Sequence, residues 1–284
     1  MSGSALALVL VAALIHAGWN ALAKRARDPL VFLWSSVTLA SLGLAPLGAW
    51  VIVAEGWKPG GASFVLATVA VHAVYFWVLA RAYGSGDLSV VYPVARGLGV
   101  ALVPVLALVF LHERVSALGA LGVALVVAGI VVIYVLGTPW NIGRSRPPVS
   151  MWSIATGLTV AVYSIIDKAG VARVHPLAYI SLMGLGISVL LAPWVLTRRE
   201  SLGREWRTNG RAIILASSMN LTSYLLVLFA FRQAKASYVV AARETSIVFS
   251  VLIGSLIMRE AHAGSRLIGA LVVLLGVVCV ALAR

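Results

Sequence analysis

The chain of 284 residues is 61% hydrophobic and only 11% charged, with a formal net charge of +13. A soluble domain carries roughly 25% charged residues and about half apolar ones. The composition therefore excludes disordered chains, coiled coils and ordinary globular folds, and it leaves a polytopic membrane protein. The basic residues are spread between apolar runs, so we expect contact with anionic lipid head groups and no nucleic-acid partner.

Ten apolar runs predict ten transmembrane helices and an all-α fold, because a crossing helix needs about 20 apolar residues. None of the runs alternates in polarity as a transmembrane strand does. Basic residues follow the first run instead of preceding it, which indicates a retained helix and not a signal peptide. The runs are Met1–Ala23, Pro29–Ala54, Pro59–Ala80, Leu88–Leu111, Val115–Gly143, Pro147–Ile166, Pro176–Thr197, Ala212–Phe231, Ala236–Met258 and Leu267–Ala283.

The two halves of the chain resemble each other at a constant offset of 147 residues. Each unit has five spans, so the second unit enters the membrane upside down relative to the first. Such an inverted repeat is typical of secondary transporters. We predict one five-helix repeat over residues 1–143 and a second over residues 147–284. The matching pairs are Pro29 and Pro176, Pro46 and Pro193, Arg96 and Arg243, Glu113 and Glu260, Gly122 and Gly269, and Gly129 and Gly276.

The end of each unit carries a motif in which a glutamate is followed by two spaced glycines. The first copy is Glu113, Gly122 and Gly129, and the second is Glu260, Gly269 and Gly276. This pattern resembles the EamA branch of the drug/metabolite transporter superfamily. From their symmetry, we expect the two glutamates to form a cap or an ion pair at the start of the next helix.

The resemblance implies a ten-helix carrier for amino acids or other small metabolites, with many members acting as exporters. It also implies a multi-pass protein of the bacterial inner (plasma) membrane with both termini in the cytoplasm. The loops after odd-numbered spans hold most of the basic residues. The positive-inside rule therefore predicts the opposite orientation.

Polar and aromatic side chains gather on one face of spans 1, 3, 4, 6, 8 and 9. A cavity between two inverted halves predicts this distribution, because polar groups within a membrane face a cavity or a partner. The candidates for substrate binding are His16, Trp19, Asn20, His72, Tyr75, Tyr92, Arg96, Tyr163, Asp167, Tyr224, Arg243 and Glu244.

The charged candidates each have a functional and a structural interpretation. Arg96 and Arg243 are suited to bind a carboxylate. Alternatively, Arg243 pairs with Glu244 or Asp167, or either arginine reaches the interface. Asp167 is suited to bind an amine or carry a proton, or it simply ends its helix. His16 either couples transport to protons or is a hydrogen-bonded structural histidine.

We predict a secondary transporter, with export as the expected direction, that moves a small zwitterionic or anionic metabolite such as an amino acid by alternating access. One alternative is a carrier or efflux protein for drugs or for phosphorylated or phosphonate metabolites. Another is an intramembrane enzyme, and a third is a receptor or scaffold.

The sequence lacks the motifs that the enzyme alternative needs. His112-Glu113 is followed by Ser116 where a zinc protease needs its second histidine, and neither Gly-x-Ser-x-Gly nor a Walker loop occurs. We therefore expect no catalysis, cofactor or metal. The expected partners are a small-molecule substrate and membrane lipid, and a homodimer is left open.

Overall fold

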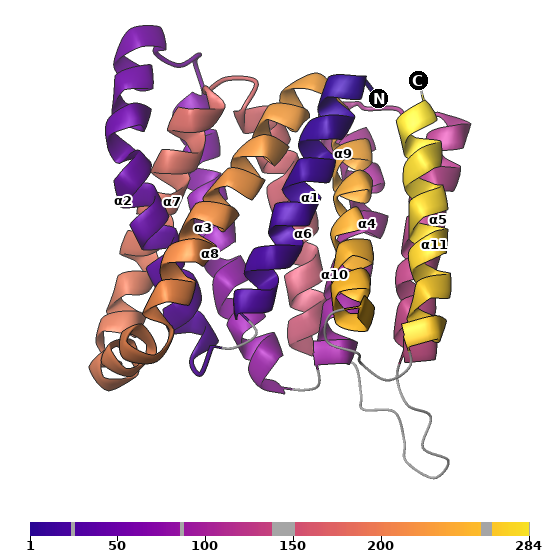
Figure 1. Cartoon of the computed structure of the whole chain (residues 1–284). Coiled ribbons are helices and arrows are strands. Elements are labelled where there is room, and N and C mark those ends of the chain that lie inside the picture. Colours follow the sequence, from indigo (N-terminus) through magenta and orange to yellow (C-terminus); the bar gives the residue numbers. More distant parts are fainter. Residues whose placement is uncertain (24–25, 86–87, 138–150, 257–262, 284) are drawn as a thin grey trace.

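The computed structural model describes residues 1–284 except 24–25, 86–87, 138–150, 257–262 and 284. Within the described residues the chain is helical and contains no strand. Figure 1 shows the helices side by side, with both chain ends at the same end of the bundle. The helices are α1 (Gly3–Ala23), α2 (Pro29–Glu55), α3 (Gly61–Ser85), α4 (Leu88–Leu111), α5 (Ala117–Gly137), α6 (Met151–Gly170), α7 (Pro176–Leu196), α8 (Arg199–Gln233), α9 (Ala236–Arg243), α10 (Thr245–Leu256) and α11 (Ala263–Leu282).

Six of the described helices are long and apolar enough to cross a membrane: α1, α2, α3, α5, α7 and α8. Shorter apolar stretches lie in α4 and α11. The ninth predicted span is interrupted at Glu244, which separates α9 from α10. These observations fit the all-helical prediction, and the count of ten spans stays a prediction.

Two helices of the first and second halves start in the same way. Asp28 caps α2 by accepting a hydrogen bond from the Val31 N–H, and proline follows at the first helical position. His175 caps α7 by accepting from the Leu177 N–H, and proline again follows. Proline suits this position because the first helical N–H has no partner within the helix. The sequence therefore fixes both starts locally.

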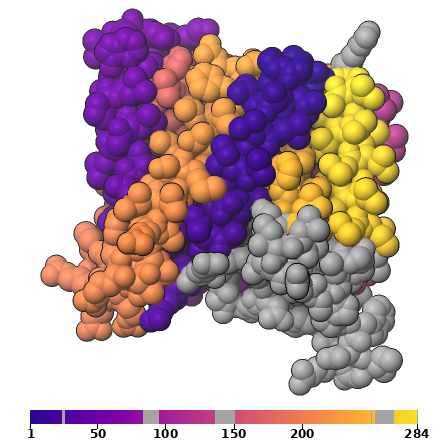
Figure 2. Space-filling model, viewed as in Figure 1, coloured from indigo at the N-terminus to yellow at the C-terminus, as the bar shows by residue number. Residues whose placement is uncertain are grey.

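The packing of the helices is nearly unchanged when the two halves are exchanged. The α2–α7 pair forms one edge of the bundle and the α5–α11 pair forms the other (Figure 1). Between them α1 packs on α8 as α3 packs on α6, and α4 packs on α6 as α10 packs on α1. In the space-filling view, α1 lies between α8 on one side and α10 and α11 on the other (Figure 2). This pairing fits a chain built from two related halves, and the inverted orientation of the two halves stays a prediction.

The α5–α11 contact depends on four glycines. A Cβ atom added at Gly122 would lie 2.7 Å from the Gly276 carbonyl oxygen, and one added at Gly276 would lie 2.6 Å from that of Gly122. Gly129 and Gly269 have the same relation at 2.8 Å. Small residues at such positions let two helix backbones approach closely, which is a common way to pack helices in membranes. The glycines of the repeated motif thus serve packing.

The arginine-rich stretch before the eighth predicted span is helical rather than a loop. The predicted span starts at Ala212, whereas α8 begins at Arg199 and is 35 residues long. Its polar first part is held by buried Glu205, which accepts hydrogen bonds from the backbone N–H groups of Arg27 and Asp28. Hydropathy marks only the apolar part of such a helix, so the apolar run underestimates its length.

Glu113 caps a different helix from the one expected. Its carboxylate accepts a hydrogen bond from the N–H of Ala236, the first residue of α9, at 2.8 Å. It also lies 3.7 Å from the Nζ atom of Lys168. Glu113 therefore joins the end of α4 to α9 and α6, and not to α5, which follows it in the chain. The corresponding Glu260 lies outside the described residues.

Candidate substrate site

A pocket with an empty volume of about 600 Å³, counting its open mouth, lies among seven helices of the bundle. The helices are α1, α2, α3, α6, α7, α8 and α9. The lining residues are His16, Trp19, Val37, Ala40, Ser41, His72, Tyr75, Phe76, Tyr163, Ile180, Met183, Gly184, Ile187, Asn220, Leu221, Tyr224 and Arg243.

Most of the predicted site residues gather around this pocket. The structure brings together His16, Trp19, His72, Tyr75, Tyr163, Tyr224 and Arg243. Asn20 does not line the pocket, and its Nδ2 atom donates to the His16 carbonyl oxygen. The side chain of Tyr92 lies outside the described residues. Three charged candidates, Arg96, Asp167 and Glu244, are buried nearby but are not among the lining residues.

Arg96 and Glu244 pair with each other. The Nε atom of Arg96 donates to Glu244 Oε2 at 2.9 Å, and its Nη2 atom lies 2.7 Å from Oε1. Arg96 is 6% exposed and Glu244 is 2% exposed. The pair joins α4 to the α9–α10 junction, and so links the two predicted repeats. Both oxygens of the carboxylate are thereby occupied, which matches the structural interpretation of Arg96 with a partner that we did not predict.

Arg243 is the charged side chain of the described pocket lining. Among the described residues, no carboxylate oxygen lies within 4.0 Å of its nitrogen atoms. Its Nε atom is buried and has no hydrogen-bond partner in the described structure. A buried polar atom normally has such a partner, so this one calls for an explanation. The guanidinium also stacks over the Tyr224 ring, with Cζ 5.4 Å from the ring centroid.

His16 holds the guanidinium of Arg243 in place. Its Nδ1 atom lies 3.3 Å from Arg243 Nη2 and 3.1 Å from the indole Nε1 of Trp19. Arginine and tryptophan nitrogens only donate, so Nδ1 accepts both hydrogen bonds. The imidazole is therefore neutral with its proton on Nε2. This geometry matches the structural interpretation of His16.

Asp167 is fully buried and accepts hydrogen bonds from three hydroxyl groups. Its Oδ1 atom accepts from Thr68 at 2.5 Å and from Tyr179 at 2.8 Å. Its Oδ2 atom accepts from the Tyr224 hydroxyl. Hydroxyl donors compensate a buried carboxylate for part of its lost hydration. The cluster joins α3, α6, α7 and α8, and it leaves neither carboxylate oxygen without a donor.

His72 lies between this cluster and the pocket. Its Nδ1 atom is 3.1 Å from the Thr68 carbonyl oxygen, which only accepts, so Nδ1 donates there. Its Nε2 atom faces Asp167 Oδ2 at 3.9 Å. The ring stacks on Tyr163 with centroids 4.3 Å apart, and Tyr75 meets Tyr163 edge-on at 5.4 Å. These rings form an aromatic wall, which we define as His72, Tyr75, Tyr163 and Tyr224.

The sequence did not point to the residues that α2 and α7 contribute to the pocket. These helices supply Val37, Ala40, Ser41, Ile180, Met183, Gly184 and Ile187. Their apolar character resembles that of a lipid-facing span, so composition does not separate the two. The repeat offset carries a usable signal, because it relates Val37 to Gly184 and Ala40 to Ile187, and all four line the pocket. It likewise relates His16 to Tyr163.

Two models of transporter families match parts of the chain. A model of the EamA-like transporter family matches residues 148–282, and a model of the Small Multidrug Resistance protein matches residues 53–126. Both matches are consistent with the EamA/drug-metabolite transporter superfamily. Together with the apolar helices they support a multi-pass membrane protein that transports small molecules.

The solved structures agree on the fold. Several chains match, and one of them, a protein crystal structure, has a TM-score of 0.76 at 15% sequence identity. That match covers 98% of this chain and 96% of the other chain. At this identity the likeness concerns the fold alone. No curated protein matches the sequence.

Proposed function

We propose that this protein is a secondary transporter, operating as an exporter, for a small anionic or zwitterionic metabolite such as an amino acid. The pocket is the proposed substrate site. The observation that supports it best is Arg243, a 92%-buried cation in the pocket lining without a described carboxylate partner. A charge buried in this way is costly unless a partner arrives. A substrate carboxylate supplies such a partner.

The geometry around Arg243 suits carboxylate binding. The Nη2 atom of Arg243 contacts His16, and the guanidinium lies over the ring of Tyr224. These two contacts fix the orientation of the planar guanidinium. The buried Nε atom has no described partner and stays available. Arginine binds carboxylates with two parallel hydrogen bonds, which gives both affinity and orientation. The same chemistry accepts a phosphate or phosphonate, which is the second candidate substrate class.

We propose alternating access because of the way in which the two predicted repeats are joined. The helix that carries Arg243 breaks at the next residue, and the break is tied to the other repeat by the Arg96–Glu244 pair. In inverted-repeat carriers the substrate site lies at the repeat interface, commonly beside an interrupted helix. We propose that the two repeats rock around this pair and expose the pocket to each side in turn.

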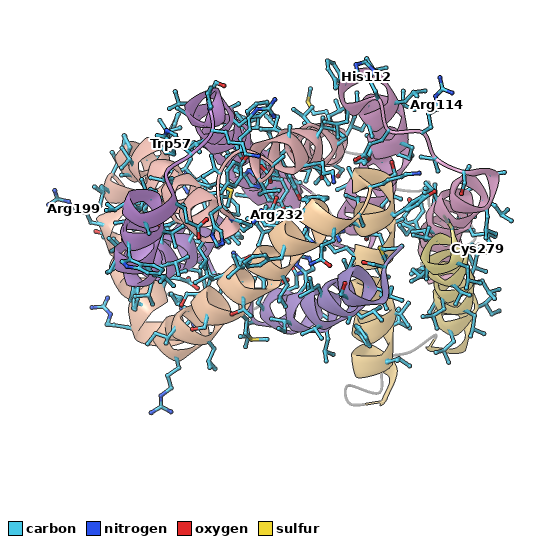
Figure 3. The ribbon with its side chains drawn as sticks, turned by 90° about the horizontal axis from the view of Figure 1, so that it is seen from above. Trp57, His112, Arg114, Arg199, Arg232 and Cys279 are labelled. Carbon is cyan, nitrogen blue, oxygen red and sulfur yellow. The ribbon has the colours of Figure 1, made fainter. Side chains whose placement is uncertain are left out.

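Counterflow in liposomes tests the transport proposal. Purified protein is reconstituted, loaded with an unlabelled panel of amino acids, organic acids and phosphonates, and assayed for uptake of each labelled member. Arg243→Gln is expected to abolish uptake and Arg243→Lys to retain part of it. Arg199→Gln is the matched control, because Arg199 is exposed and points away from the bundle in Figure 3. The proposal is wrong if no panel member moves faster than in protein-free liposomes, or if Arg243→Gln transports like the control.

Labelling from the two membrane sides tests alternating access. Ser41 lines the pocket, so Ser41→Cys in a Cys279→Ala background places one thiol there. A membrane-impermeant maleimide is expected to react with it from either side, and substrate is expected to slow both reactions. Reaction from a single side under every substrate condition would contradict alternating access.

A further inference from the structure

The charges around the pocket point to a narrower substrate class than the family does. Resting on the proposed function, we infer that the pocket selects an organic monoanion, meaning a carboxylate joined to a bulky aromatic or apolar body, over the zwitterion with the same skeleton. The two ligands differ by the ammonium group. The described pocket lining holds a cation for the carboxylate and no carboxylate for the ammonium.

Arg243 has hydrogen-bonding capacity left for a carboxylate. It lines the pocket, and its Nε atom is buried without a described partner. The other described lining residues include no aspartate, glutamate or lysine. His16 is held neutral by its two donors. The described lining therefore carries a net positive charge that one carboxylate neutralises.

Both acids near the pocket already have partners of their own. Glu244 engages Arg96 with both oxygens, at 2.9 and 2.7 Å. Asp167 accepts from three hydroxyl groups, and neither acid lines the pocket. An ammonium group in this pocket would lose its hydration without an anionic partner, which is unfavourable in a low-dielectric site. It would also stand in the field of Arg243.

The remaining walls favour an apolar body. The aromatic wall of α3, α6 and α8 lies beside Arg243, whose guanidinium stacks on Tyr224. The residues that α2 and α7 contribute to the pocket are aliphatic or small. Apolar lining residues of this kind pack well against a ring or a branched chain of the substrate, and they offer it few hydrogen bonds. The apolar side chains are Val37, Ala40, Phe76, Ile180, Met183, Ile187 and Leu221.

A matched set of three ligands tests the inference. Phenylpropionate and phenylalanine share a skeleton and differ by the α-ammonium group, and phenethylamine has the amine without the carboxylate. Equilibrium binding of each labelled ligand to the purified full chain avoids the passive leak of a weak acid through lipid. We expect phenylpropionate to bind at least about tenfold more tightly than phenylalanine, and phenethylamine not to bind, because an unpaired buried charge is strongly rejected.

The variants separate this inference from the proposed transport function. Arg243→Gln is expected to lose phenylpropionate binding, while Arg199→Gln binds like the wild type and both variants keep the wild-type melting temperature within a few degrees. Phenylalanine binding as tight as phenylpropionate would overturn the inference and leave a zwitterion carrier. Binding of none of the three by folded protein would also overturn it, and the counterflow panel would then decide the transport proposal separately.

Discussion

The Arg96–Glu244 pair makes the sharpest prediction about stability. Arg96→Met leaves the 2%-exposed Glu244 carboxylate without its cation, and breaking a buried pair in this way costs about 3–5 kcal/mol. In a chain of this size, 1 kcal/mol moves the melting temperature by roughly 2–4 °C. The single variant is therefore expected to melt on the order of 10 °C lower. Replacing both partners, as in Arg96→Met/Glu244→Leu, removes the unpaired charge, so the double variant is expected to recover most of the loss.

Thermal unfolding of detergent-purified protein, followed by tryptophan fluorescence, measures these shifts. Ligand binding is measured on the same samples. Because neither residue lines the pocket, the double variant is expected to keep ligand binding at Arg243. An Arg96→Met variant as stable as the wild type would refute the structural role of the pair. A stable double variant that no longer binds would instead assign Arg96 to the substrate.

Two further predictions concern the packing and the buried acid. Gly276→Ala would bring a Cβ atom to 2.6 Å from a carbonyl oxygen of α5, so it is expected to lower the melting temperature strongly. Gly43 has open space around it, so Gly43→Ala is expected to leave the melting temperature unchanged or slightly raised. Equal melting temperatures of the Gly276→Ala and Gly43→Ala variants would contradict the close approach of α5 and α11. Tyr179→Phe removes one donor from Asp167 and is expected to cost roughly 1.5–3 kcal/mol with ligand binding retained, since Tyr179 does not line the pocket. Tyr224→Phe removes another donor and is expected to weaken binding as well, because Tyr224 lines the pocket; an effect on binding from Tyr179→Phe alone would argue against this division.

Much of the helical fold is readable from the sequence because its signals are local. Apolar runs between charges mark the helices, and Pro29 and Pro176 mark two helix starts that the structure places at those residues. The start of α8 at Arg199 is not readable from hydropathy, because its first part is polar and held by a distant contact with Glu205. The same limit applies to Glu113, whose partner on α9 is chosen by packing between distant segments.

In the candidate site, too, local patterns predict some features, and contacts between distant segments decide the others. Polar faces on the predicted spans identify the aromatic wall and Arg243, because a polar group in an apolar helix has few other places to lie. Only an arginine that is not paired with Glu244 is available to bind an anion. Glu244 pairs with Arg96 and not with Arg243, which precedes it in the sequence. The choice of Arg96 is made by the contact of α4 with α9 across the two predicted repeats, which no local pattern records.

The central claim is that Arg243 is the anion-binding group of the pocket. An experimental structure with bound para-bromophenylpropionate tests it most directly, because the anomalous signal of bromine fixes the orientation of the ligand. We predict the carboxylate within hydrogen-bond distance of Arg243 and the bromine peak against the aromatic wall. A carboxylate placed on Arg96, or a bromine peak outside the pocket, would contradict the claim.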